Sequence, residues 1–366
     1  MLRTALSIAA TIAAGCSTAA CGGDDADRAT ARQAQAPVAL SLRQAIGQRF
    51  VFPFAGTTPP KALERRIRRG EAAGVILFGR NVRSVGRVRA MTRRLQAIPR
   101  PPGLRAPLLV LADHEGGPVR RLPGGPDRAA AQTTTATQAR AAGVTAGRLL
   151  RRGGVNVDLA PVVDVGRPGS AMRRERRAYP GDAPSVARLA GAFAGGLRAA
   201  NVEAAFKHFP GFGAATVNTD DAPARITTPL ATLRERDLKP YELERQALRM
   251  VMLSTAVYPA RDPRPAAFSR RWVTDELRTR LRLPDVVAIT DDLQTPAVAR
   301  YGSPAQLAFF AVQAGVDLPL FAKDYRTAAR AAEGLRRAVA EGALTRADLD
   351  AGARRVLALR AALKTR

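Results

Sequence analysis

The sequence predicts an α/β fold: a (β/α)8 barrel of the TIM type, built as a single domain over residues 38–366. Three observations support this prediction. The chain has 366 residues, of which 46% are hydrophobic, which suffices for one large barrel. Short apolar runs alternate with helical stretches, and no repeat or compositional break divides this region. Eight such runs occur, at residues 50–54, 74–79, 107–113, 157–165, 204–210, 250–258, 286–292 and 315–321.

Each predicted element has the composition that its place in a barrel requires. The eight runs consist almost continuously of Val, Ile, Leu and Ala, as parallel strands do when helices cover them. The stretches between them are rich in Arg and Ala, and residues 328–340, for example, have the pattern of an exposed amphipathic helix. The folded part begins near Leu40, so strands and helices then alternate in order to the end of the chain.

The residues before the barrel predict export. Residues 1–20 combine an early Arg3 with a short apolar, alanine-rich run, which is typical of a signal peptide and too short for a convincing membrane span. Small residues precede Cys21, and a Gly-Gly-Asp-Asp stretch follows it, so we predict lipidation at Cys21, with Cys16 as the alternative. Residues 21–37 then form a tether or linker. The predicted location is the outer face of the cell membrane, reached only through the lipid anchor; an unlipidated, secreted protein is the alternative.

The charge is strongly positive, at +27, and comes almost entirely from Arg. Such a charge attracts nucleic acids, anionic lipid head groups or anionic cell-wall polymers. The arginines are scattered along helical stretches such as residues 63–69, and no nucleic-acid motif accompanies them. We therefore predict no nucleic-acid partner. Attraction to anionic wall polymers is a hypothesis at this point.

Polar residues follow several of the predicted strands. In a barrel, the C-terminal ends of the strands meet at one mouth, and the site is built there. A single strand-end carboxylate is often structural, but several that converge point to a binding or catalytic site. The residues in question are Asp113, His114 and Glu115 after the third run, Asp164 in the fourth, Lys207 and His208 in the fifth, and Asp291 and Asp292 after the seventh.

These motifs resemble the bacterial family 3 glycoside hydrolases, in particular the single-domain β-N-acetylglucosaminidases that trim peptidoglycan fragments. The similarity involves residues 46–48, 74–81, 113–117, 157–165, 207–213, 290–293 and 314–318. It implies a retaining hydrolysis in which Asp291 is the nucleophile and Asp292 a supporting group. It also implies that the sugar is bound by Asp113, Arg121, Arg177, Lys207 and His208. The assignment of Arg177 depends on register within an arginine-rich stretch.

The sequence departs from the family pattern in the loop that supplies the acid. The family has a second histidine after the Lys-His-Phe-Pro-Gly turn and then an Asp-Ser-His pair; here those positions are Phe212, Asn218 and Asp220. A histidine of the sixth strand is replaced by Thr255, and an arginine after the Glu-Gly-Gly turn by Pro118. We predict that Asp220, or its neighbour Asp221, acts as the acid instead. The alternative is that residues 218–223 form only a surface turn.

Two functions follow from this pattern. The first is an exo-acting glycosidase that releases β-linked N-acetylglucosamine from cell-wall fragments; the second is a catalytically impaired carbohydrate-binding lipoprotein on the same barrel. A retained nucleophile favours the enzyme. We predict no metal site and no cofactor, since the chain has two histidines and both cysteines precede the barrel. We also predict that the protein acts as a monomer.

Overall fold

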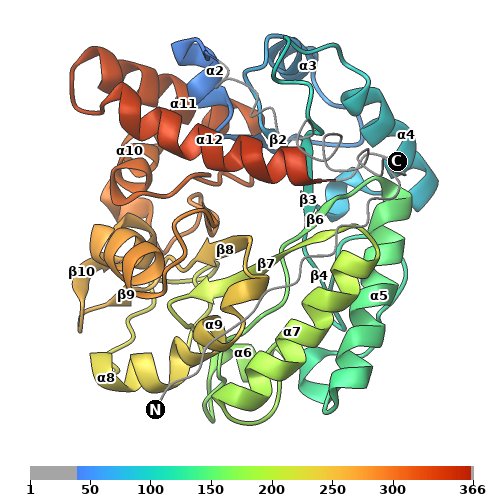
Figure 1. Ribbon diagram of the computed structural model, residues 1–366, viewed down its shortest axis with the longest axis vertical. Coiled ribbons are helices and arrows are strands. Elements are labelled where there is room, and N and C mark those ends of the chain that lie inside the picture. The colour runs from blue at the N-terminus through green and yellow to red at the C-terminus, as the bar shows by residue number, and fades with distance from the viewer. Residues whose placement is uncertain (1–38, 364–366) are drawn as a thin grey trace, which may run out of the picture. The chain divides into compact units, whose positions relative to one another are not determined.

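The computed structural model describes residues 39–363, and those from Leu40 onward form one structural unit (Figure 1). The predicted signal peptide, the linker and both candidate lipidation sites, Cys21 and Cys16, lie outside the described residues. Among the residues that are described, no helix is long and apolar enough to cross a membrane.

The centre of the unit is a curled, parallel β-sheet of seven strands (Figure 1). The order in the sheet is the order in the sequence, with each neighbouring pair parallel. This arrangement, surrounded by helices, confirms the predicted α/β barrel. The strands are β1 (Val51–Phe52), β2 (Gly74–Leu77), β3 (Leu109–Ala112), β6 (Val157–Asp158), β7 (Glu203–Phe209), β8 (Met250–Leu253) and β11 (Val287–Thr290), so seven of the eight predicted runs contain a strand.

The eighth predicted run, residues 315–321, follows β11 without becoming a regular strand. Its Leu318 forms an isolated parallel bridge with Ile289, and the Thr290 amide donates to the Leu318 carbonyl over 3.1 Å. On the other side of this run stands Arg49, which is 1% exposed. Its Nε donates to the Asp317 carbonyl at 3.1 Å and its Nη2 donates to the Val316 carbonyl. The seam between the eighth run and the beginning of the sheet is therefore bonded through a guanidinium.

Helices cover the outside of the sheet, and polar residues mark where many of them begin. The N-cap side chains of Ser84, Thr135, Asp182, Ser303 and Asp324 each accept a hydrogen bond from the third backbone amide of their helix. The predicted helix over residues 328–340 lies within α11. The helices are α2 (Leu42–Gly47), α3 (Lys61–Arg68), α4 (Val85–Gln96), α5 (Ala136–Gly153), α6 (Ala171–Arg174), α7 (Ala183–Ala199), α8 (Leu230–Thr232), α9 (Lys239–Leu243), a π-helix (Arg271–Arg280), α10 (Pro304–Ala314), α11 (Tyr325–Ala340) and α12 (Arg346–Ala362).

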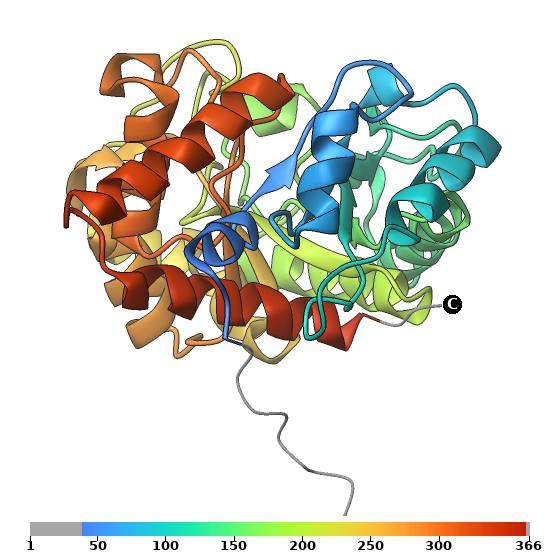
Figure 2. The same ribbon diagram turned by 90° about the horizontal axis from the view of Figure 1, so that it is seen from above.

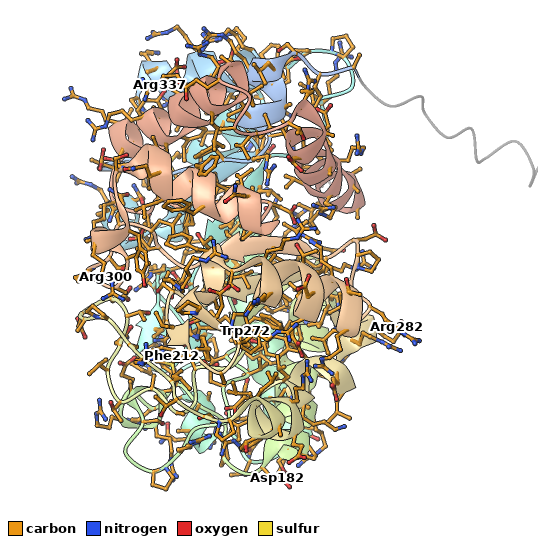
Figure 3. The ribbon with its side chains drawn as sticks, turned by 90° about the vertical axis from the view of Figure 1, so that its left-hand side faces the viewer. Asp182, Phe212, Trp272, Arg282, Arg300 and Arg337 are labelled. Atoms are coloured by element: carbon orange, nitrogen blue, oxygen red, sulfur yellow. The ribbon has the colours of Figure 1, made fainter. Side chains whose placement is uncertain are left out.

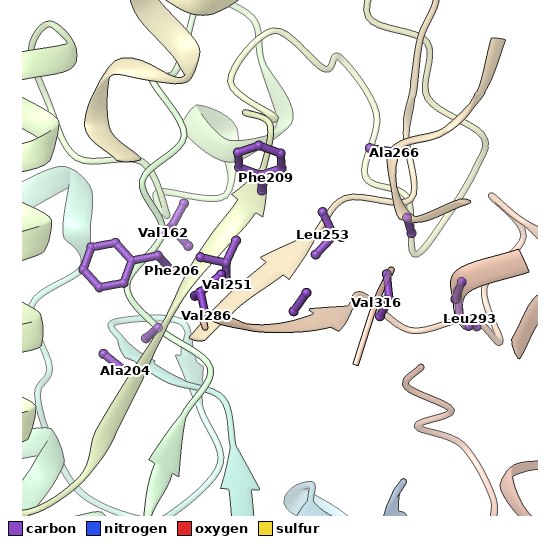
Figure 4. Packing of buried hydrophobic residues seen from close by; sticks show 14 of the residues in the cluster. Val162, Ala204, Phe206, Phe209, Val251, Leu253, Ala266, Val286, Leu293 and Val316 are labelled. Carbon is purple, nitrogen blue, oxygen red and sulfur yellow. The ribbon is translucent and has the colours of Figure 1, made fainter. Parts of the chain in front are cut away.

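Two hydrophobic clusters occupy the two faces of the sheet. Successive residues of a strand point to opposite faces, and along β8 Met250 and Met252 belong to the inner cluster while Val251 belongs to the outer one. Figure 4 shows part of the outer cluster, where Phe206 and Phe209 of β7 lie near Val251. The inner cluster fills the barrel, as expected for this fold, so the usable cavity is confined to one end.

Helices α5 and α7 pack so closely that the contact requires glycine. A Cβ atom at Gly143 would lie 2.0 Å from the carbonyl oxygen of Phe193, whereas nothing lies within 4 Å of a Cβ at the helical Gly86. We expect Gly143→Ala to lower the free energy of unfolding by about 3 kcal/mol. Gly86→Ala should leave it unchanged or raise it by about 0.5–1 kcal/mol. Urea denaturation followed by circular dichroism checks both, and equal effects of the two variants would contradict this account of the packing.

Candidate active site

A cavity of about 420 Å³ lies at the end of the barrel where the strands end. The seven residues predicted from the sequence to act on or bind a sugar all line this cavity: Asp113, Arg121, Arg177, Lys207, His208, Asp220 and Asp291. They come from different strands and loops, so their convergence is a result of the fold. Asp292 lines the cavity as well, but Asp221 and His114 do not.

A network of alternating charges forms one wall. The Lys207 ammonium, which is 2% exposed, donates to Asp113 Oδ1 at 2.8 Å and lies 2.8 Å from Glu115 Oε1. Arg177 binds both oxygens of Glu115 through Nε and Nη2, each at 2.9 Å. Burial alone would raise the pKa of Glu115, but Arg177 and Lys207 outweigh burial and hold the pKa of that carboxyl well below its usual range. Lys207, Asp113 and Glu115 are thus held in their charged forms, which bind hydroxyls well.

His208 is held in place by a buried carboxylate. Its Nδ1 lies 2.7 Å from Asp164 Oδ2, while Asp164 Oδ1 accepts the backbone amides of His208 at 3.1 Å and Phe212 at 2.6 Å. When Nδ1 carries the proton for Asp164, Nε2 is an acceptor. The edge of the Phe212 ring packs against the imidazole, with the ring centroids 5.8 Å apart. The histidine is therefore both satisfied by a carboxylate and presented to the cavity.

Two adjacent carboxylates follow β11, and their surroundings differ. Asp292 Oδ1 accepts the amides of Gln294 and Ala322, each at 2.9 Å, so it ties two loops together. Within the described part of the chain, Asp291 Oδ1 accepts only the neighbouring Asp292 amide, at 2.9 Å, and the Asp291 amide donates to the Leu253 carbonyl at 2.9 Å. Asp291 is thus positioned by the backbone while its carboxylate faces the cavity, and Asp292 supports the loop.

Asp292 makes the stability of this region depend on pH. Burial raises its pKa to about 6. A carboxyl whose pKa is raised on folding contributes stability below its ordinary pKa of about 3.9 and loses that contribution as the pH rises through about 6. We expect Asp292→Asn, whose amide oxygen can still accept both backbone bonds, to match the wild type near pH 4 and to be more stable by about 2–3 kcal/mol near pH 7.5. Thermal unfolding across this range is the measurement. Asp285→Asn, at an exposed position, is the control; a constant difference between wild type and Asp292→Asn would contradict the titration.

The loop that carries Asp220 is attached to the sugar-binding wall. Asn218 Nδ2 donates to both oxygens of Glu175, at 3.0 and 3.2 Å, and Glu175 accepts from Arg177 at 3.0 Å. Asn218 Oδ1 in turn accepts the Asp220 amide at 3.1 Å. The loop does contain a turn, closed by the Asp221 amide on the Asn218 carbonyl at 3.0 Å. The turn and the lining position of Asp220 therefore coexist, and of the two neighbouring carboxylates only Asp220 faces the cavity.

The ionisation of Asp220 suits an acid. Partial burial raises its pKa, and the negative charge of Asp291 raises it further, while His208 and Arg177 act in the opposite direction; the pKa ends above its ordinary value. Asp220 also remains exposed to solvent. A carboxyl with these surroundings holds its proton at a higher pH than an ordinary aspartate.

Some features of the site could not be assigned from the sequence. Glu115 follows the third apolar run of the sequence, but its partners Arg177 and Lys207 lie 62 or more positions away. The sequence pattern does not identify them. Glu175 lies in the arginine-rich stretch and gives no signal of its own. At the positions where the family has histidines, Phe212 is buried, and the buried Thr255 hydroxyl has no hydrogen-bond partner among the described residues. Within residues 39–363, no group of three or more His, Cys, Asp or Glu side chains could hold a metal ion.

Comparison with known proteins identifies the family. Residues 41–359 match the glycosyl hydrolase family 3 N-terminal domain. The chain is 34% identical over 338 residues to an uncharacterized secreted glycosyl hydrolase of Arthroderma benhamiae, covering 89% of this chain and 95% of that protein. It is 34% identical over 289 residues to a β-hexosaminidase of Pseudomonas aeruginosa, covering 77% and 85%. The crystal structure of a β-N-acetylhexosaminidase from Beutenbergia cavernae superposes with a TM-score of 0.79 at 34% identity, covering 88% and 99%. The chain therefore belongs to glycosyl hydrolase family 3 and is a glycoside hydrolase.

Proposed function

We propose that this protein is a retaining exo-glycosidase that hydrolyses terminal β-linked N-acetylglucosamine, with Asp291 as nucleophile and Asp220 as acid and base. The observation that carries the proposal is that both carboxylates line one cavity, together with the charged wall of Asp113, Lys207 and Arg177. The sugar is suggested by relatives named β-hexosaminidase and β-N-acetylhexosaminidase.

The reaction divides into two steps. In the first, the Asp291 carboxylate attacks the anomeric carbon while Asp220 gives its proton to the glycosidic oxygen, so the C–O bond breaks and the leaving sugar departs as an alcohol. In the second, Asp220, now ionised, takes a proton from water, and the hydroxide formed displaces Asp291 from the anomeric carbon. The raised pKa of Asp220 favours the protonated form that the first step needs.

Binding of the sugar is assigned to the charged residues of the cavity wall. The carboxylate of Asp113 accepts from hydroxyls, while Lys207, Arg121 and Arg177 donate to them, and His208 accepts through Nε2. Charged hydrogen bonds of this kind contribute more than neutral ones because each partner is already fixed and desolvated. Their preassembly, through contacts such as Lys207 to Asp113 at 2.8 Å, means that little must move when a sugar enters.

The natural substrate that we propose is a cell-wall fragment of the peptidoglycan type. This follows the expected export of the chain, through the signal peptide at residues 1–20 and lipidation at Cys21, with secretion as the alternative. One relative is itself named as secreted. Treatment of whole cells with a protease that cannot enter them, followed by detection of the protein, tests the outer location.

The decisive experiment compares two substrates that differ in leaving group. The enzyme should hydrolyse both 4-nitrophenyl β-N-acetylglucosaminide and the β-1,4-linked disaccharide of N-acetylglucosamine. Asp220→Ala should lower kcat/KM for the disaccharide by about 10²–10⁴-fold, and much less for the nitrophenyl substrate, whose leaving group scarcely needs a proton. Asp221→Ala is the matched control and should retain activity on both. An equal loss on both substrates in Asp220→Ala would rule out its role as the acid.

A second candidate function is a carbohydrate-binding protein with impaired catalysis. It is favoured by one observation: Phe212 and Thr255 stand where the family has histidines, and both are buried. In that case calorimetry would detect binding of the sugar, while neither substrate would be hydrolysed. Hydrolysis of the disaccharide by the wild type excludes this alternative.

A further inference from the structure

Arginines gather at the end of the barrel opposite the cavity. Each covering helix runs against the strands, so its last turn lies at the end where the strands begin. These last turns contain Arg65, Arg66 and Arg68 of α3, Arg93 and Arg94 of α4, Arg151 and Arg152 of α5, Arg198 of α7, and Arg278 and Arg280 of the Arg271–Arg280 π-helix. We call this end the basic end. Figure 3 shows Arg282, just beyond the π-helix, on the side opposite to Arg300 and Phe212 of the cavity end.

Two hollows open at the basic end, and both are lined by arginine. The first, of about 410 Å³, is lined by Arg89, Arg93, Arg100, Arg105 and Arg151 and by no acidic residue. The second, of about 570 Å³, is lined by Arg245, Arg249, Arg282 and Arg355, with Asp285 as its one acidic residue. Helix α12 lies between them: its Leu359 lines the second hollow, and its Arg360 binds the Pro107 carbonyl beside the first. Both hollows therefore lie next to α12, which Figure 2 shows in red along one edge of the molecule.

Part of this arginine content is structural. Arg100 donates to the Leu104 and Ile98 carbonyls, Arg355 pairs with Asp317, and a cation in the last turn of a helix complements the helix dipole. Arg93, Arg105 and Arg282 are different. They are exposed, and their side chains form no hydrogen bond or ion pair with any residue that the structure describes. Their charges are thus available to an external anion.

At the opposite end, carboxylates and basic side chains occur together around the cavity. The carboxylates include Asp220, Asp291 and Asp292, and the basic side chains include Arg121, Arg177 and Lys207. The described chain starts beside α12, where the Leu40 carbonyl accepts from Arg346.

We propose that the basic end docks onto a bilayer that contains anionic phospholipids, which directs the cavity away from the bilayer. Guanidinium groups match phosphate oxygens in shape and charge, and several of them on one face add their attraction to the negative surface. A flat anionic surface can meet both hollows at once, together with the exposed arginines that line them: Arg93 and Arg105 in the first hollow and Arg282 in the second. The proposal does not depend on glycosidase activity or on a lipid at Cys21.

The test is sedimentation of the full chain with vesicles, either of phosphatidylcholine alone or with about one third phosphatidylglycerol. Binding should require phosphatidylglycerol and should fall when salt is raised from about 0.1 M to about 0.5 M. The triple variant Arg93→Gln/Arg105→Gln/Arg282→Gln should bind about a hundredfold more weakly. The control, Arg83→Gln/Arg270→Gln/Arg300→Gln, removes the same charge from exposed positions at the cavity end and should bind less than about threefold more weakly.

Equal losses in the two triple variants would overturn the proposal, because net charge alone would then explain the binding. So would binding that is independent of phosphatidylglycerol, which would assign it to the apolar residues near the N-terminus. An orientation measurement keeps the proposal testable if a triple variant fails to fold. With Cys16 and Cys21 replaced by serine, an environment-sensitive dye on Arg282→Cys should shift to shorter wavelength with anionic vesicles, and the same dye on Arg300→Cys should not. The reverse pattern would place the cavity end on the bilayer.

Discussion

Replacing Asp291 by alanine is expected to lower kcat/KM for 4-nitrophenyl β-N-acetylglucosaminide by about four orders of magnitude or more, because Asp291 is the group that we propose to form the covalent intermediate. The geometry supports this expectation. Asp291 is fixed through its amide at the end of β11, and among the described residues its carboxylate has no partner from another element whose contact would have to be broken for attack. Unlike the loss of Asp220, this loss should be equally large for good and poor leaving groups.

Added azide distinguishes the two carboxylates by the product that forms. In Asp291→Ala, azide can occupy the vacated space and attack the substrate directly, so the product is the α-glycosyl azide. In Asp220→Ala, azide attacks the glycosyl-enzyme and gives the β-glycosyl azide. Nuclear magnetic resonance of the products separates the two. Asp292→Asn is the matched control for Asp291, and substantial activity in Asp291→Ala without azide would disprove its role as nucleophile.

Replacing Lys207 by methionine is expected to lower the free energy of unfolding by about 3–5 kcal/mol as well as abolishing most activity. The ammonium is buried between Asp113 and Glu115, so its removal leaves two carboxylates facing each other with less compensating charge. Arg177 still binds Glu115, but Asp113 keeps only the longer contact of 3.5 Å with Arg121. Chemical denaturation measures the stability, and 4-nitrophenyl hydrolysis measures the activity.

A second substitution separates charge from packing. Adding Glu115→Gln to Lys207→Met removes one of the two negative charges that face each other, so the double variant should recover part of the lost stability while remaining inactive. If the losses of unfolding free energy in Lys207→Met and Glu115→Gln simply add in the double variant, Lys207 acts through packing alone. The explanation by charge is then wrong.

The sequence predicted the fold and much of the cavity because both depend on local patterns. Apolar runs gave the strands, and polar residues such as Asp113 and Lys207 directly at their ends had to meet at one mouth. The eighth run shows the limit. Its residues are as buried as those of a strand, yet regular pairing depends on a neighbour that the sequence pattern does not specify, and residues 315–321 form only an isolated bridge. Run lengths were also overestimated, since β6 ends at Asp158 while the apolar pattern continues to Val165.

Contacts between loops could not be predicted from the sequence, for a different reason. The link from Asn218 through Glu175 to Arg177 joins segments that are 43 residues apart, and nothing in either segment identifies the other. Whether Asp220 or Asp221 faces the cavity likewise depends on the conformation of the turn, because adjacent residues of a loop point in different directions. Whether a residue carries charge can be deduced from the sequence; which residue it faces cannot.

The guanidinium at the barrel seam has a consequence for biosynthesis. Arg49 is translated early, whereas its carbonyl partners Val316, Asp317 and Asp348 follow 267 to 299 positions later. During translation the first strands and helices can pair with their neighbours as they emerge, but this buried arginine has no acceptors until nearly the whole described chain has been synthesised. Closure of the ring is therefore a late event, and the first and last segments of the barrel complete each other.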